Sequence, residues 1–156
     1  MIAVRPATPS DIPALMALLI QVNMVHHVGR PDLFRGPTTK YTEAELSAIL
    51  ADPATPVFVA TDDSGKVLGH GFCVLQHSGG RLMEAHDTLY IDDICVDEAA
   101  RGLGVGRALY GHILAFARMK GCYNVTLNVW TCNPGAMQFY EKLGLKPYKV
   151  GMETIL

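Results

Sequence analysis

The stretch from Leu89 to Lys120 reads LYIDDICVDEAARGLGVGRALYGHILAFARMK and determines how the rest of the chain is organised. Its beginning is rich in β-branched and aromatic side chains, which predicts a strand over Leu89–Val96. A glycine-rich turn, Arg101–Gly106, follows a short polar link. Beyond the turn, apolar residues recur at the spacing of an amphipathic helix. These residues are Val105, Leu109, Ile113 and Phe116.

A strand, a glycine-rich turn and the N-terminus of a helix together make a binding site for a phosphorylated ligand. Closely spaced glycines let the backbone come near an anion. The first N–H groups of a helix have no partner within the helix and point toward the anion, with the positive end of the helix dipole behind them. The sequence therefore predicts a phosphate site at this turn.

The spacing of the glycines argues against two kinds of nucleotide site. A P-loop needs a lysine and a hydroxyl residue directly after its last glycine, and this turn has neither. A dinucleotide fingerprint would need a third glycine where Arg107 or Leu109 stands, and it belongs near the first strand of a βαβ unit. A turn that only caps its helix is still compatible with these residues.

The composition predicts one globular domain over residues 1–156, because 49% of the residues are hydrophobic and 18% are charged. A net charge of −2 provides no general attraction to nucleic acid or to an anionic membrane, and we expect neither as a partner. The longest apolar stretch, around Pro13–Ile20, is too short to span a bilayer, and we expect no signal peptide. The scattered cysteines predict neither a disulfide framework nor a zinc site, which favours a cytoplasmic protein. They are Cys73, Cys95, Cys122 and Cys132.

The rest of the chain predicts strands and helices in the order β-α-α-β-β-β-α-β-α-β, which gives a mixed sheet flanked by helices. Strands are expected at Ile2–Arg5, Val57–Thr61, Val67–Gln76 and Tyr123–Trp130, and near Tyr148–Ile155. Helices are expected after the cap at Thr8, as far as about Val22, and over Glu43–Leu50 and Gly135–Leu143. A long loop is expected at His26–Lys40.

Two motifs resemble those of the GNAT N-acetyltransferase superfamily. Arg101-x-x-Gly104-x-Gly106 is similar to its acyl-CoA pyrophosphate loop, [QR]-x-x-G-x-[GA]. Residues 133–145, NPGAMQFYEKLGL, are similar to its N-x-x-A-x-x-x-Y-x-K-x-G-F segment, with Leu145 where an aromatic residue is common. The opening RPATPSDI and the order of elements also resemble the family. The resemblance implies an α/β (α+β) fold, the GNAT fold, with a mixed, mostly antiparallel sheet, helices on both faces and splayed central strands.

The resemblance also implies transfer of an acetyl group from acetyl-CoA to a primary amine, by direct attack in a ternary complex. The phosphates of the cofactor would lie on the glycine turn, and its pantetheine arm would pair with the strand Leu89–Val96 where that strand splays from the next. Core packing by Ile94 and Val96, and helix capping by Asn133, are compatible with these roles. The implied cofactor-binding residues are Ile94, Cys95, Val96, Arg101, Gly102, Leu103, Gly104, Val105, Gly106, Arg107, Asn133 and Tyr140.

Three residues are catalytic candidates. By resemblance Tyr140 is the general acid that protonates the departing thiolate, although an aromatic residue on a helix can also simply pack on the core. Asp92 and Asp93 interrupt an apolar strand and should point to opposite faces, so that at least one meets an interior or a cleft. Asp92 matches the proposed base of spermidine/spermine N-acetyltransferases, which are similar here. Either acid could instead form a structural ion pair.

The acceptor is expected to enter past the segment that contains His26, His27 and Arg30, because loops here form the acceptor wall in the family. It would be a small-molecule or protein amine. Two adjacent histidines point in different directions and have no third ligand nearby, so we expect no metal. The sequence leaves the oligomeric state open; homodimers are frequent in the family that it resembles, and the last strand is a plausible partner edge. The alternative function is an acyl-CoA-binding sensor or regulatory module without efficient transfer.

Overall fold

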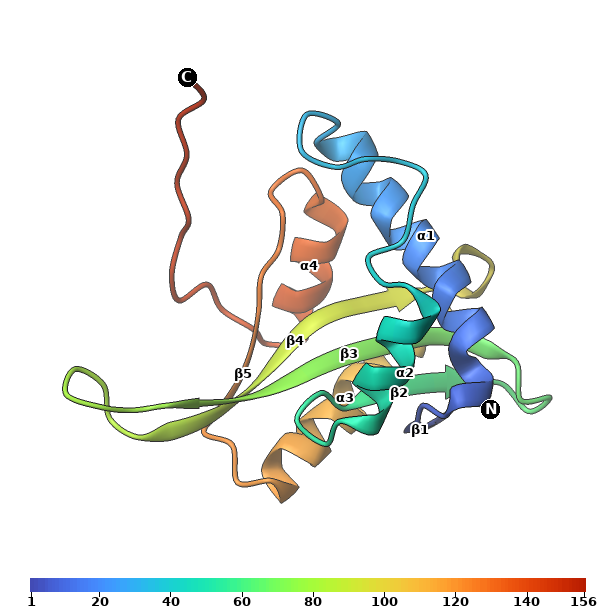
Figure 1. Ribbon diagram of the computed structural model, residues 1–156, viewed down its shortest axis with the longest axis horizontal. Coiled ribbons are helices and arrows are strands. Elements are labelled where there is room, and N and C mark those ends of the chain that lie inside the picture. The colour runs from blue at the N-terminus through green and yellow to red at the C-terminus, as the bar shows by residue number, and fades with distance from the viewer.

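The computed structural model describes all residues from Met1 to Leu156 and is built around one sheet of five strands, in the order β1-β2-β3-β4-β5 (Figure 1). The strands are β1 (Ala3–Pro6), β2 (Val57–Thr61), β3 (Val67–Ser78), β4 (His86–Val96) and β5 (Asn124–Leu127). Each of the pairs β1–β2, β2–β3 and β3–β4 is antiparallel, and β5 runs parallel to β4. The expected mixed, mostly antiparallel sheet is confirmed.

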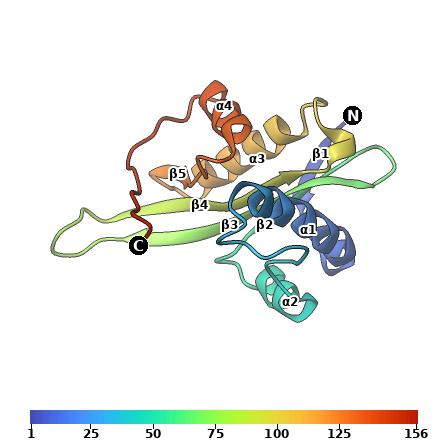
Figure 2. The same ribbon diagram turned by 90° about the horizontal axis from the view of Figure 1, so that it is seen from above.

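Two pairs of helices cover the two faces of the sheet. They are α1 (Ile12–Gly29) with α2 (Glu43–Ala51), and α3 (Val105–Met119) with α4 (Pro134–Lys142). Figure 2 shows α1 and α2 on one side of the sheet, with α3 and α4 on the other. Each face has its own core. Leu109 and Ile113 of α3 are fully buried on one face, and Leu15 and Leu46 of the α1–α2 pair are fully buried on the other.

The start of α1 follows the predicted cap. The backbone N–H of Thr8 donates to Asp11 Oδ2 at 2.8 Å, and both guanidinium nitrogens of Arg5 reach the same carboxylate. These bonds lower the pKa of Asp11 below its usual range, the hydrogen bonds from Arg5 being the largest cause. A buried carboxylate with this many donors stays ionised and ties β1 to the helix.

Three expected boundaries are wrong. The helix α1 continues to Gly29, so His26 and His27 lie on a helix rather than in a loop. The last turn of α1 can pack against Cys132 because Gly29 has no side chain; an added Cβ would lie 2.5 Å from Cys132 Sγ. The strand expected over Tyr123–Trp130 covers only Asn124–Leu127. No strand forms near Tyr148–Ile155, because that segment has no neighbouring strand within the chain.

The segment Pro9–Gly29 is long and apolar enough to cross a membrane, judged by length and composition alone, contrary to the shorter apolar stretch expected from the sequence. In the structure, the helical part of this segment packs on β3, β4 and α2. Its inward residues Leu15, Leu18 and Leu19 are buried there, whereas only 17% of the apolar stretch as a whole is buried.

Candidate active site

The glycine turn before α3 has the geometry of an anion site. Gly102 and Gly104 have φ angles of 80° and 83°, in the left-handed region that favours glycine. The backbone N–H groups of Gly102, Leu103 and Gly104 donate no hydrogen bond within the protein, and all three residues are exposed. Unpaired donors at the start of a 15-residue helix favour a negatively charged ligand.

The second motif packs directly on this turn. Gly106 is buried in the first turn of α3, and a Cβ on it would lie 2.9 Å from Cζ of Phe139 in α4. Asn133 caps α4, because its Oδ1 accepts a hydrogen bond from the N–H of Ala136 at 3.2 Å. The helix that carries Tyr140 is therefore placed against the phosphate turn by the absence of a side chain at Gly106.

The strands β4 and β5 part in the middle of the sheet. Their pairing ends at Ile91 and Leu127, whereas β4 continues to Val96. The edge of β4 from Asp92 to Val96 on this side is therefore not paired with β5. This is the opening that the resemblance implies for the pantetheine arm, and its backbone groups are available to an extended ligand.

The two carboxylates lie at a β-bulge in β4. Phe72 of β3 is opposite Asp93 and Cys73 is opposite Ile91, so Asp92 is the extra residue. Asp92 contacts the connection between α1 and α2, and Asp93 contacts His70, whose ring packs on Phe72 in the same core. The expectation of opposite faces is wrong, because the bulge interrupts the alternation of side chains and turns both toward the α1–α2 side.

The carboxylate of Asp92 is already engaged. Its Oδ2 accepts a hydrogen bond from Lys40 Nζ at 2.6 Å and another from the Tyr41 hydroxyl at 3.1 Å. Although burial alone would lower the pKa of Lys40, its bond and charge contact with Asp92 leave it raised. Asp92 is therefore one half of an ion pair.

Asp93 has a different partner. His70 is completely buried and its Nε2 lies 2.7 Å from Asp93 Oδ2, while its Nδ1 has no hydrogen-bond partner. A second proton on Nδ1 would leave a buried donor unsatisfied, so we assign the neutral tautomer with the proton on Nε2. The Nε2–H then donates to Asp93 and holds the carboxylate in one orientation.

The negative charge of Asp93 also affects the pKa values of Tyr140 and His26. The pKa of Tyr140 is raised, mainly by burial and further by the charge of Asp93. The pKa of His26 is lowered, mainly by burial; the charge of Asp93 opposes this shift and the charge of Lys40 adds to it. The structure thus gathers Asp93, Tyr140, His26 and Lys40 around one region.

The other candidates lie in less reactive positions. His27 Nδ1 is 2.6 Å from the carbonyl oxygen of Phe34, and Arg30 is paired with Asp32 and Glu153. Burial raises the pKa of the Cys95 thiol to about 12, which makes the thiolate rare at neutral pH and Cys95 a poor nucleophile.

The sequence reasoning missed His70, Lys40 and Tyr41. His70 lies between Gly69 and Gly71 in an apolar strand, and nothing in that pattern indicates a partner 23 residues away. Lys40 is the last residue of the expected loop and Tyr41 follows it, and a loop pattern does not predict which strand its residues contact. One signal could have pointed to Lys40: a carboxylate within an apolar strand, such as Asp92, needs a cationic partner.

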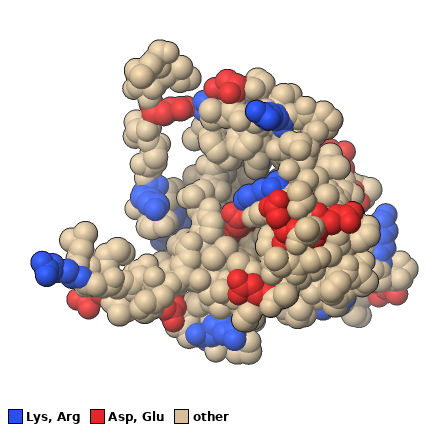
Figure 3. Space-filling view, in the orientation of Figure 1, with Lys and Arg blue, Asp and Glu red and all other residues tan.

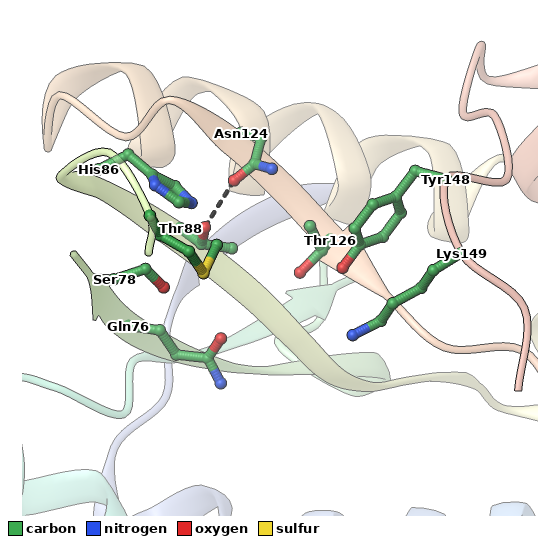
Figure 4. A pocket seen from close by; sticks show the side chains of 9 residues that line it. Gln76, Ser78, His86, Thr88, Asn124, Thr126, Tyr148 and Lys149 are labelled. Carbon is green, nitrogen blue, oxygen red and sulfur yellow. Dashed lines mark hydrogen bonds between the residues drawn. The ribbon is translucent and has the colours of Figure 1, made fainter. Parts of the chain in front are cut away.

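A polar cavity of about 340 Å³ lies further along the sheet, between the β3–β4 hairpin, β5 and the start of the C-terminal segment (Figure 4). Thr88 donates to Asn124 Oδ1 at 2.6 Å on its floor. Figure 4 shows Tyr148 and Lys149 reaching toward it from the chain beyond α4. The other lining residues are Gln76, Ser78, Met83, His86 and Thr126.

Comparison with known proteins gives consistent relatives. The family model described as "Acetyltransferase (GNAT) family" matches residues 23–145. Glucosamine 6-phosphate N-acetyltransferase 1 of Oryza sativa subsp. japonica is 38% identical over 109 residues, which cover 69% of this chain and 62% of that protein. A peptidyl-lysine N-acetyltransferase of Salmonella typhimurium is 30% identical over 105 residues, covering 66% of this chain and 60% of the relative. The chain thus spans less than two thirds of the length of these relatives.

Among solved structures, a tetramutant of the BH1408 protein from Bacillus halodurans superposes with a TM-score of 0.94. It is 29% identical to this chain, and the alignment covers 99% of both chains.

Proposed function

Because the chain belongs to the GNAT family of acetyltransferases, we propose that it transfers an acetyl group from acetyl-CoA to a primary amine. The observation that carries this proposal is the turn before α3, where exposed N–H donors at Gly102–Gly104 stand beside a helix N-terminus. These donors suit a pyrophosphate. The exposed side chains of Arg101 and Arg107 lie in the same segment and add positive charge.

The residues present fit acetyl-CoA in a second respect, since the unpaired edge of β4 from Asp92 to Val96 can hold an extended arm. When bound, acetyl-CoA supplies the acetyl thioester that the amine attacks. The role of Ile94 and Val96 is to offer backbone hydrogen bonds along this edge and to exclude water with their side chains.

We assign removal of the amine proton to Asp93 rather than to Asp92. Lys40 Nζ lies 2.6 Å from Asp92 Oδ2, so this carboxylate already has a cationic partner and a bound amine would have to compete with it. Asp93 receives one hydrogen bond from the neutral His70, which orients its carboxylate without cancelling its charge. Asp92 and Lys40 then form a structural pair that keeps the connection between α1 and α2 in place.

Tyr140 is the proton donor in this proposal. Its raised pKa keeps the phenol protonated throughout the neutral range, and its hydroxyl makes no hydrogen bond within the protein. An unengaged, protonated hydroxyl in a half-buried position can deliver its proton to the sulfur that departs from the acetyl group.

The acceptor proposed is a small amine or an exposed lysine, the two kinds of acceptor named for the relatives. We also propose a homodimer, supported by exposed apolar side chains near the C-terminus. A cytoplasmic location is proposed from the four cysteines, all of which are free.

The test measures release of free CoA thiol over a panel of amines, with pH–rate profiles for matched variants. Asp93→Asn should lower kcat by about 10²- to 10⁴-fold and remove the acidic limb of the profile. Asp92→Asn, the matched control, should keep that limb. His70→Gln should lower kcat and shift the limb, since a purely structural histidine would leave its position unchanged.

Two results would contradict the proposal. If acetyl-CoA binds tightly but no amine is acetylated, the protein is an acyl-CoA sensor instead. If Asp92→Asn rather than Asp93→Asn removes the acidic limb, the roles of the two carboxylates are reversed.

A further inference from the structure

A primary amine of the protein itself lies beside the candidate site. Lys40, in the connection between α1 and α2, places its Nζ 2.6 Å from Asp92 Oδ2. Asp92 begins the part of β4 that does not pair with β5, which is the edge along which the proposed function places the arm of the cofactor. The chain therefore carries an ε-amino group of its own next to the place proposed for the acetyl group.

The surroundings of this amine suit an alkylammonium group. Asp92 Oδ2 also accepts a hydrogen bond from the Tyr41 hydroxyl at 3.1 Å, and Lys40 Nζ lies 5.5 Å from the centre of the Tyr41 ring. Carboxylates and the faces of aromatic rings both attract ammonium groups. The charge of Asp93 acts on Lys40 in the same direction as the charge of Asp92. Lys40 thus occupies an ammonium site at the bulge that carries both candidate bases.

Solvent reaches this ion pair, so the amine is free to move. The side chain of Lys40 is 51% exposed, and that of Asp92 is 20% exposed. Figure 3 shows basic and acidic side chains in contact near the middle of the visible face, where the beginning of α2 lies over the sheet. Half-exposed ion pairs contribute little, because water and salt screen them. The long side chain of Lys40 can therefore carry its amine from Asp92 toward a ligand on the adjacent edge.

No other lysine shares this position. Lys40 is the only lysine that forms an ion pair, and the only one that contacts the carboxylates of the bulge. Lys66, for comparison, is exposed in the turn between β2 and β3, and its amine has no carboxylate partner. The remaining lysines lie at the ends of α3 and α4 and in the segment beyond α4; they are Lys120, Lys142, Lys146 and Lys149.

We propose that Lys40 is an internal acetyl acceptor, whose ε-amino group is acetylated from acetyl-CoA on the β4 edge when no external amine competes. This inference rests on the proposed function, because it needs the cofactor in the place described there. Acetylation converts the ammonium into a neutral amide and so removes the ion pair with Asp92. The modified chain then has an Asp92 carboxylate without a cationic partner, tied to the connection between α1 and α2 through Tyr41 alone.

The atoms and protons of this transfer balance. The Lys40 ammonium gives one proton to Asp92, which it contacts in the structure. The lone pair of the nitrogen then forms a bond to the acetyl carbon, and the bond from that carbon to sulfur breaks. The sulfur takes a proton from Tyr140, and the second proton that leaves the nitrogen returns to Tyr140 through water. The products are acetyl-lysine and free CoA, and Asp92 releases one proton to the solvent.

The first experiment incubates the full chain with acetyl-CoA and no other amine, and locates added acetyl groups by peptide mass spectrometry. Labelling of Lys40 should exceed that of Lys66 by at least about tenfold, because only Lys40 lies beside the bound donor. With N-hydroxysuccinimidyl acetate, which needs no binding site, the order should reverse, since Lys40 is paired and Lys66 is free. Equal labelling of the two lysines by acetyl-CoA overturns the proposal. A preference of the general reagent for Lys40 also overturns it, because the preference would then belong to the amine alone.

The second experiment measures a consequence that does not depend on catalysis. Lys40→Gln removes the same charge as acetylation, and chymotrypsin should cleave this variant after Phe34 or Tyr41 about two to five times faster than the parent. Acetylated parent protein should match the variant. Lys66→Gln, the matched control, and Lys40→Arg, which keeps the charge, should be cleaved at the parent's rate. If acetylated and unmodified chains are cleaved equally fast, acetylation does not release the connection and the proposed consequence is wrong.

A failure of this inference is distinguishable from a failure of the proposed function. If an external amine is acetylated while Lys40 stays unmodified in the absence of that amine, the inference is wrong and the proposed function stands. If neither Lys40 nor any external amine is acetylated, both are wrong. Acetylation of Lys40 that an added acceptor amine suppresses supports both.

Discussion

The substitution Gly106→Ala tests how the phosphate turn and the proton donor are joined. Gly106 is buried where α3 meets α4, and an added Cβ would lie 2.9 Å from Cζ and 3.4 Å from Cε2 of Phe139. Contacts below 3.0 Å force something to move. The aromatic ring is the group that must give way, and it precedes Tyr140 directly in α4, at 5.2 Å between ring centroids.

Two opposing effects determine the expected change in stability. Alanine is favoured over glycine inside a helix by about 1 kcal/mol. Crowding in a packed core costs about 1–3 kcal/mol. The net loss in free energy of unfolding should therefore be about 0–2 kcal/mol. Gly111→Ala, in the same helix, is the matched control: no atom lies within 4 Å of the added Cβ, so it should stabilise by about 0.5–1 kcal/mol.

Urea unfolding of both variants gives the free energies, and steady-state kinetics give the effect on the site. A small displacement of Tyr140 should lower kcat of Gly106→Ala by about tenfold or more, while Gly111→Ala stays near the parent. If Gly106→Ala is stabilised as much as Gly111→Ala and keeps full kcat, the close contact between Gly106 and Phe139 does not set the position of α4.

Three further predictions concern the site. Tyr140→Phe should lower kcat by at least about tenfold while calorimetry shows CoA binding nearly unchanged; equal loss in both would remove Tyr140 from the acid role. Gly104→Ala should weaken CoA binding by about tenfold, because alanine is strained at a φ of 83°. Gly65→Ala, at a φ of 85° in a distant turn, should lower stability without affecting CoA binding; a similar loss of affinity there would contradict CoA binding at the turn Gly102–Gly104. Because the pKa of His26 is lowered in the folded state, the unfolded chain binds more protons below about pH 6.5, and stability should fall on acidification through that range. His26→Asn should flatten this slope in urea titrations, and an unaltered slope would contradict the burial of a neutral His26.

Local patterns explain why much of the fold could be predicted. The cap at Thr8 and Asp11, the hairpin of β2 and β3 and the turn at Gly102–Gly106 all depend on residues close together in sequence, and the structure has each of them. The end of α1 was misjudged for the opposite reason. Its last turn, through His26 to Gly29, depends on the approach of Cys132, which lies far away in the chain.

The last predicted strand shows a different limit. The residues around Val150 and Met152 have the composition and alternation of a strand, but a strand exists only when another pairs with it. No strand of the same chain pairs with residues 146–156, so this segment stays extended and unpaired. The local pattern favours an extended backbone. It does not specify which strand, if any, will pair with that backbone.

The bulge in β4 has the greatest consequence for the site. In a regular strand Asp92 and Asp93 would point to opposite faces of the sheet, so only one of them could contact a ligand bound on a given face. Because Asp92 is the extra residue of the bulge, both carboxylates turn to the α1–α2 side. Their partners nevertheless differ. Lys40 Nζ lies 2.6 Å from Asp92 Oδ2, whereas Asp93 contacts His70 at 2.7 Å and has no lysine or arginine partner, which leaves Asp93 as the carboxylate available to a cationic amine.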